Sequence, residues 1–107
     1  MTVKQLTALQ LKKRLEEAAD LLLLDVREPI EFQYARINNS VLIPLNQLPD
    51  RIDELDPKQE TVVICHHGIR SQQAAYFLAD SGFVNIANLT GGIDAWSVHC
   101  DRLVRRY

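Results

Sequence analysis

The sequence of 107 residues contains little cysteine, no excess of basic residues and no long apolar run. Its two cysteines are too few for a disulfide scaffold, so we expect the reducing cytoplasm as its location. The basic side chains number 12 and the acidic ones 14, and a formal charge of −2 does not favour nucleic acid as a partner. A run of membrane-spanning length is missing, and the start Met1–Lys4 lacks the apolar core of a signal peptide, so no membrane partner is expected.

What is present is the composition of one compact domain, and we expect a single domain over residues 1–107 without repeat or linker. Short apolar or β-branched runs alternate with segments of helical periodicity. The runs predict strands at residues 3–6, 21–26, 41–43, 62–65 and 84–89. Helices are predicted after a Thr7 cap, with Leu11, Leu15, Ala18 and Ala19 on one face, and also at 29–35, at 48–55 and after Gly68. This order predicts an α/β fold with a five-stranded parallel sheet, helices on both faces and a binding site at the carboxyl ends of the strands.

One cysteine, Cys65, stands where the apolar run Val62–Ile64 meets a helix. Gly68 can take a positive φ in the connecting loop, and Ser71 is expected to N-cap the helix, which Gly82 ends. Backbone N–H groups at a helix start have no intrahelical partner and carry the positive end of the helix dipole, so a sulfur placed there is favoured as thiolate. The thiolate is the nucleophilic form of cysteine, which makes Cys65 the candidate catalytic residue.

Spacing alone does not decide the role of Cys65, because a buried structural cysteine is the commoner explanation of a lone Cys-x4-Arg pattern. The strand, the glycine, the arginine and the following helix together favour a nucleophile. Arg70 adds a permanent charge that can pair with an anionic substrate.

Three ordered segments resemble signatures of the rhodanese-like sulfurtransferase family. They are Leu24–Glu28 with Glu31–Phe32, Cys65–Ser71, and Gly91–Trp96, and they span nearly the whole chain. The resemblance implies a rhodanese-like fold and a reaction that moves a sulfane sulfur from a donor such as thiosulfate to cyanide or a thiol. By position, Cys65 would carry a persulfide, and the substrate-binding loop would consist of His66, His67, Gly68, Ile69 and Arg70. No cofactor is implied; the partners would be a small-molecule sulfur donor, a thiol or cyanide acceptor, and in one alternative a protein sulfur acceptor.

The chain departs from the family at Ala35–Ser40, where members often have two glycines. Asn38 and Asn39 tolerate left-handed conformations, so the turn is expected to form, with a different pocket rim. Family members that act as phosphatases or arsenate reductases carry one residue more between Cys and Arg, so the shorter loop here favours sulfur transfer over those reactions. A sulfur-carrier module that serves one partner enzyme remains the other alternative.

Three residues are expected to support the site rather than to react. Asp25 and Arg27 follow a buried strand and predict an ion pair that holds loops near the site, with Glu31 as a partner of Arg27. Ser71 supports the site through its helix cap. Neighbouring histidines seldom face one ion, so no metal site is predicted at His66 and His67.

The segment after residue 90 is expected to close the fold near the cysteine. Gly91 and Gly92 allow a tight turn close to Cys65, and Trp96 is expected to pack the last helix against the core. The second cysteine, Cys100, is expected to be inert rather than a resolving thiol.

Overall fold

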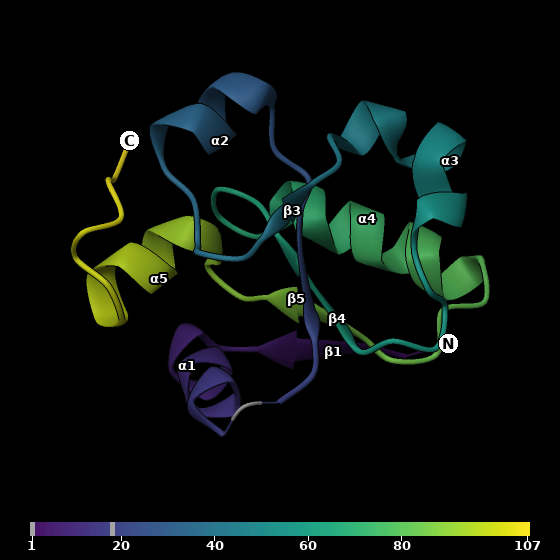
Figure 1. Ribbon diagram of the computed structural model, residues 1–107, viewed down its shortest axis with the longest axis horizontal. Coiled ribbons are helices and arrows are strands. Elements are labelled where there is room, and N and C mark those ends of the chain that lie inside the picture. Colours follow the sequence, from purple (N-terminus) through teal and green to yellow (C-terminus); the bar gives the residue numbers. More distant parts are fainter. Residues whose placement is uncertain (1, 18) are drawn as a thin grey trace.

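The computed structural model describes residues 2–17 and 19–107, which form a parallel sheet between helices (Figure 1). The strands are β1 (Val3–Leu6), β2 (Leu22–Asp25), β3 (Val41–Leu42), β4 (Thr61–Ile64) and β5 (Ile86–Leu89). The helices are α1 (Ala8–Glu16), α2 (Pro29–Tyr34), α3 (Leu48–Arg51), α4 (Ile69–Asp80) and α5 (Gly92–His99), with 3-10 turns at Leu45–Gln47 and Ile52–Glu54. The predicted α/β class and five-stranded parallel sheet are confirmed.

The strand order β1-β5-β4-β2-β3 places β4 at the centre of the sheet. Its four residues are all buried, and it pairs with β2 on one side and β5 on the other. Asp25 lies opposite Ile64 in the register, so β2 and β4 end at the same level. Because the strands are parallel, the loops that follow them meet at one edge, and Cys65 emerges at that edge.

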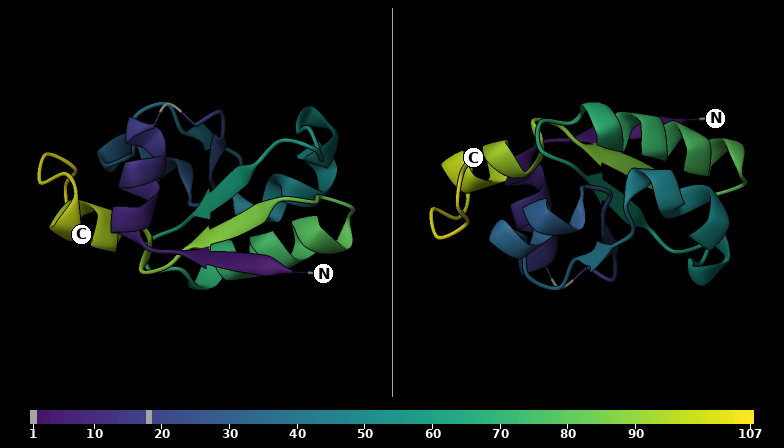
Figure 2. Two further views of the ribbon diagram at one scale, coloured as in Figure 1. Left: turned by 90° about the horizontal axis from the view of Figure 1, so that it is seen from below. Right: turned by 90° about the horizontal axis from the view of Figure 1, so that it is seen from above.

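Alternate residues of β4 face opposite sides of the sheet, which gives the domain two cores. Val62 and Ile64 pack with Leu11 of α1 and Trp96 of α5. On the other face, Val63 packs with apolar residues of α3 and α4, which are Leu48, Ala74, Ala75 and Leu78. Figure 2 shows α1 beside α5, with α4 on the opposite side of the sheet. The predicted packing of Trp96, which is 8% exposed, is confirmed.

Most predicted elements are present with shifted ends. The second and fifth strands begin later than predicted, at Leu22 and Ile86, and the third ends at Leu42. The helix predicted at 48–55 changes after Arg51 into a 3-10 turn. These ends depend on which backbone groups find a ladder or helix partner, which apolar runs do not specify.

The first helix begins as predicted, with a capping box at Thr7. The Thr7 hydroxyl accepts from the Gln10 backbone N–H at 3.1 Å, and the Thr7 N–H donates to the Gln10 side chain at 2.9 Å. The helix ends at Glu16, so the prediction that Ala19 belongs to it is wrong; Ala18 lies outside the described residues.

The turn at Ala35–Ser40 forms without the glycines that family members often have. Asn39 takes a left-handed conformation with φ of 67°, and the chain then enters β3 beside β2. Within the described part of the chain, every helix is too short or too polar to cross a membrane.

Candidate active site

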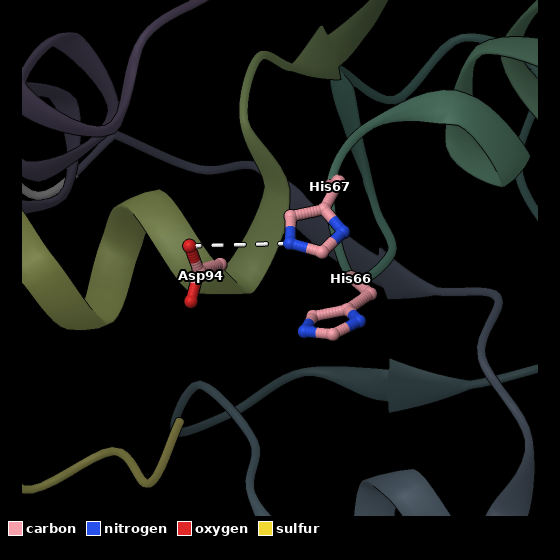
Figure 3. A group of neighbouring side chains, drawn as sticks. All are labelled: His66, His67 and Asp94. Atoms are coloured by element: carbon pink, nitrogen blue, oxygen red, sulfur yellow. Dashed lines mark ion pairs between the residues drawn. The ribbon is translucent and has the colours of Figure 1, made fainter. Parts of the chain in front are cut away.

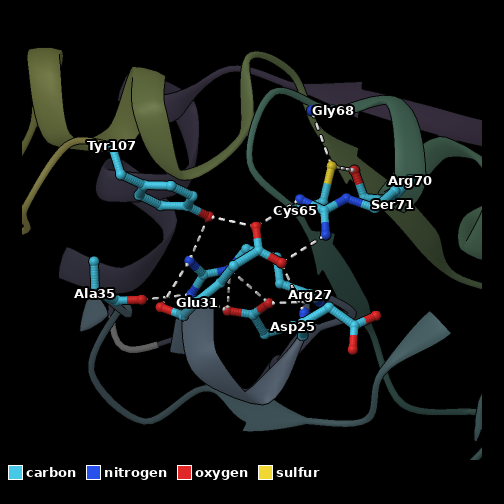
Figure 4. A network of polar contacts seen from close by, with 10 residues as sticks. Asp25, Arg27, Glu31, Ala35, Cys65, Gly68, Arg70, Ser71 and Tyr107 are labelled. Atoms are coloured by element: carbon cyan, nitrogen blue, oxygen red, sulfur yellow. Dashed lines mark hydrogen bonds and ion pairs between the residues drawn. The ribbon is translucent and has the colours of Figure 1, made fainter. Parts of the chain in front are cut away.

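Cys65 follows β4, and its sulfur lies inside the loop that leads to α4 (Figure 4). The residue is 1% exposed. The Gly68 backbone N–H donates to Sγ at 3.0 Å, and the Ser71 hydroxyl lies 3.2 Å from the same atom. Gly68 has φ of 109°, as predicted, and this left-handed conformation turns its N–H toward the sulfur. Both groups lie within hydrogen-bonding distance of the sulfur, where a donor stabilises negative charge.

Ser71 does not cap α4, and that prediction is wrong. The helix begins at Ile69 with Gly68 as N-cap, because the left-handed glycine lets the chain start the helix three residues earlier. Ser71 is instead the third helical residue and is fully buried. Its hydroxyl lies between Cys65 Sγ and the side-chain oxygen of Asn88, which is 2.5 Å away, and its single proton is donated to one of the two at a time.

Sequence reasoning missed Asn88, which lies in the buried strand β5 and is 4% exposed. Its amide nitrogen donates to Gln5 at 3.1 Å, so a polar chain runs from the sulfur through Ser71 to the first strand. The available signal was one amide side chain within the apolar run at 86–89.

Backbone N–H groups at the start of α5 hold the cysteine loop through hydrogen bonds. The Ile93 N–H donates to the Cys65 carbonyl at 2.9 Å, and the Asp94 N–H donates to the His66 carbonyl at 3.2 Å. Gly92, with φ of 63°, packs so closely that a Cβ there would lie 2.5 Å from the Cys65 carbonyl oxygen. The predicted tight turn of Gly91 and Gly92 near Cys65 is confirmed, and it fixes the backbone of the loop.

The predicted ion pair of Asp25 and Arg27 is confirmed, and both residues are fully buried. Arg27 donates to Asp25 Oδ1 from Nε at 2.9 Å and to Oδ2 from Nη2 at 2.7 Å. Its remaining donors reach the Ala35 carbonyl at 2.5 Å and the Tyr107 hydroxyl at 2.8 Å. The buried guanidinium therefore ties the loop after β2 to the end of the chain.

The Glu31 carboxylate pairs with Arg70 rather than with Arg27, which corrects the sequence prediction. Arg70 donates from Nη1 and Nη2 to the two carboxylate oxygens at 2.7 and 2.8 Å, while Arg27 reaches only the Glu31 backbone carbonyl at 3.3 Å. The hydrogen bonds from Arg70 lower the pKa of Glu31 to about 2, and the carboxylate raises the pKa of Arg70. The positive charge of Arg70, which the sequence assigned to an anionic substrate, is therefore already paired with the Glu31 carboxylate.

Tyr107 closes one side of this network and was missed by sequence reasoning. Its hydroxyl accepts from Arg27 and donates to Glu31 Oε1 at 2.9 Å. Its ring stacks on His66 with centroids 3.9 Å apart. Tyr107 lies 76 positions after Glu31, so no local sequence pattern predicts this contact.

Two histidines and Asp94 lie together beside the loop (Figure 3). One ligand atom from each lies within 4.8 Å of the others, and His66 Nε2 is buried without a hydrogen-bond partner in the described chain. The rings of His66 and His67 are stacked, with centroids 3.9 Å apart and planes 28° apart. An imidazole nitrogen binds a metal in its own ring plane, so nearly parallel rings do not converge on one ion. Asp94 is also bound by Arg106 at 2.8 Å.

The protonation of His66 follows from its surroundings. Burial, and next the neighbouring His67, lower the pKa of His66. His67 is 61% exposed in its side chain and lies 4.0 Å from Asp94. No local pattern predicts that Asp94 joins the two histidines, since 27 positions separate it from His67.

The loop residues divide between two surfaces. His67, Gly68 and Ile69 line a cavity of about 510 Å³ together with Gln72 and Tyr76 of α4. His66 and Arg70 face Tyr107 and Glu31 on the other side. Cys100 follows α5 and packs against the core on the α1 side, where burial raises its pKa.

Comparison with known proteins agrees with this geometry. The sequence matches the family described as rhodanese-like domain over residues 7–99. It is 34% identical over 97 residues to a sulfurtransferase of Allochromatium vinosum, covering 91% of each chain. It is 30% identical over 103 residues to the thiosulfate sulfurtransferase GlpE of Coxiella burnetii, covering 92% of each chain.

Two further proteins extend the comparison. The putative sulfur carrier protein YrkF of Bacillus subtilis is 36% identical over 86 residues, which is 80% of this chain and 46% of that protein. The crystal structure of a rhodanese-related protein from Thermoplasma volcanium has a TM-score of 0.82 and 34% identity, covering 91% of this chain and 93% of that one. The chain therefore belongs to the rhodanese-like domain family.

Proposed function

We propose that this protein is a sulfurtransferase that carries a sulfane sulfur on Cys65 from a donor such as thiosulfate to cyanide or a thiol. The observation that supports this most directly is the sulfur of Cys65 with the Gly68 N–H at 3.0 Å and the Ser71 hydroxyl at 3.2 Å. Membership of the family and the relatives named sulfurtransferase support the same class of reaction. A reducing cytoplasm suits such a cysteine, because free thiols persist there.

The reaction consists of two displacements at sulfur. The Cys65 thiolate attacks the sulfane sulfur of thiosulfate; a bond forms between Sγ and that sulfur, and the bond to the sulfonate breaks with release of sulfite. The persulfide then holds the negative charge on its outer sulfur. An acceptor thiolate or cyanide attacks this sulfur, and the electron pair of the broken S–S bond returns to Sγ. A covalent intermediate thus divides one transfer into two easier steps.

The loop contributes donors rather than a proton carrier. The Gly68 N–H stabilises negative charge on Cys65 before and after each displacement, and the Ser71 hydroxyl adds to this when its proton turns from Asn88 to the sulfur. We assign substrate contact to His66, His67, Gly68, Ile69 and Arg70, the residues of the loop. Asp25 and Arg27 hold the neighbouring loop in place through their buried ion pair.

The test is the intact mass of the protein after incubation with thiosulfate. We expect the mass to rise by one sulfur atom and to return to its initial value when cyanide is added. Cys65→Ser should abolish the gain and the turnover, while the matched control Cys100→Ser should keep both. Loss of turnover in Cys100→Ser with full activity in Cys65→Ser would refute the assignment.

A sulfur-carrier role is the second candidate, favoured by the similarity to the protein named as a putative sulfur carrier. A carrier would accept sulfur on Cys65 but release it slowly to small thiols and cyanide. Measuring loading and release separately distinguishes the two functions, because only the enzyme turns over with small acceptors.

A further inference from the structure

Charged side chains beside the cysteine loop occur as pairs of opposite sign. One of these pairs is Arg70 with Glu31, which meet through two hydrogen bonds at 2.7 and 2.8 Å (Figure 4). Arg70 closes the loop that begins at Cys65. The other pairs are Arg27 with Asp25 and Arg106 with Asp94.

The Arg70–Glu31 pair is held in place from several sides. Glu31 Oε2 also accepts the Glu28 backbone N–H at 2.9 Å, and Oε1 accepts the Tyr107 hydroxyl at 2.9 Å. The side chains of Arg70 and Glu31 are 34% and 17% exposed, so neither is free to reorient in solvent. A bidentate contact with these supports keeps the carboxylate on the guanidinium when a ligand arrives.

The pairing changes the charge that an approaching sulfur donor meets beside Cys65. Thiosulfate is a dianion, and its approach to a thiolate requires positive charge that is not already compensated. The outer N–H groups of Arg70 can still donate to a bound donor, but the pair as a whole has no net charge. A donor with a smaller negative charge does not need such compensation.

We propose that the Glu31–Arg70 pair keeps the surroundings of the Cys65 sulfur close to neutral and selects persulfides over the thiosulfate dianion as sulfur donors. This inference rests on the proposed sulfur transfer and makes Glu31 a specificity-determining residue. In the transfer, the Cys65 thiolate attacks the outer sulfur of R–S–SH and forms a bond from Sγ to it. The S–S bond of the donor breaks, its electron pair leaves with the R–S⁻ thiolate, and the proton stays on the transferred sulfur.

The experiment removes the charge of Glu31 and keeps its shape. Glu31→Gln retains an oxygen for the Glu28 N–H, and Glu54→Gln removes an equal charge from the distant exposed pair of Arg51 with Glu54. Both are made in a Cys100→Ser background. The first readout is the ratio of the alkylation rates of Cys65 by iodoacetate and by iodoacetamide, which differ in charge; the thiolate fraction cancels in this ratio.

The second readout is the ratio of kcat/KM for thiosulfate to kcat/KM for methanethiosulfonate. Both donors carry a sulfane sulfur on a sulfonyl group, but methanethiosulfonate has one negative charge less. Freeing one positive charge near the reacting sulfur should raise each ratio about threefold in Glu31→Gln. Glu54→Gln should leave both ratios unchanged.

Unchanged or lower ratios in Glu31→Gln would overturn the proposal, because they would mean that Glu31 orients Arg70 toward anions instead of neutralising it. The alkylation ratio does not depend on sulfur transfer. If neither donor loads Cys65, the proposed function fails and the donor preference fails with it, whereas a changed alkylation ratio would still report the neutralised charge of Arg70.

Discussion

Substituting Gly92 by alanine tests whether the start of α5 holds the cysteine loop in place. Gly92 has φ of 63°, and a Cβ there would lie 2.5 Å from the Cys65 carbonyl oxygen and would also overlap the His66 carbonyl group. Backbone atoms of the loop cannot move aside as a flexible side chain would, so the loop must shift.

The matched control is Gly82→Ala. Gly82 also has a positive φ, 95°, but a Cβ there would meet nothing within 4 Å. Both substitutions carry the cost of a left-handed alanine, about 1–2 kcal/mol. Only Gly92→Ala adds the overlap, which costs about 1–3 kcal/mol more when a packed neighbour must move.

We therefore expect Gly92→Ala to lower the free energy of unfolding by about 2–5 kcal/mol and Gly82→Ala by about 1–2 kcal/mol. Chemical denaturation measures both values, and each kcal/mol corresponds to a shift in Tm of about 4–8 °C for a domain of this size. The rate of persulfide formation on Cys65 should fall in Gly92→Ala and stay near wild type in Gly82→Ala. Equal destabilisation of the two variants, with unchanged reactivity of Cys65, would refute the role given to the β5–α5 turn.

Three further predictions concern the loop and its surroundings. Hydrolysis of aryl phosphates should be negligible beside sulfur transfer, because four residues separate Cys65 from Arg70 and the loop is too short to surround three phosphate oxygens. A substantial phosphatase rate that depends on Cys65 would contradict this prediction. Tyr107→Phe removes the hydroxyl that joins Arg27 to Glu31 and should cost about 0.5–1.5 kcal/mol of stability, measured by urea denaturation, and a neutral result would mean that water replaces the hydroxyl. The pKa of Glu31 falls from 4.5 to about 2 on folding, so the stability that its carboxylate contributes is complete above pH 4.5 and is lost as the pH falls through about 2. The unfolding free energy of Glu31→Gln should therefore change less over this range than that of wild type. Parallel curves for the two proteins would refute the pairing of Glu31 with Arg70.

Sequence patterns alone predicted the features that depend on near neighbours. The alternation of apolar runs and helical segments predicted the parallel sheet, because each residue type favours its own backbone conformation and burial. The cap at Thr7 and the positive φ of Gly68 were predicted for the same local reason. The position of Cys65 at the end of a buried strand followed from the strand and loop signals beside it, whereas the central place of that strand in the sheet did not.

The tertiary structure decided which side chains meet. Ser71 could cap a helix or reach the cysteine, and the left-handed Gly68 settled this by starting α4 earlier. Glu31 lay within reach of both Arg27 and Arg70, and the buried pair of Arg27 with Asp25 left its carboxylate to Arg70. Local preference sets the path of the chain over a few residues, but hydrogen-bond partners from distant segments depend on how the strands and helices pack. The hydrogen bond from the Tyr107 hydroxyl to the Glu31 carboxylate is the clearest case.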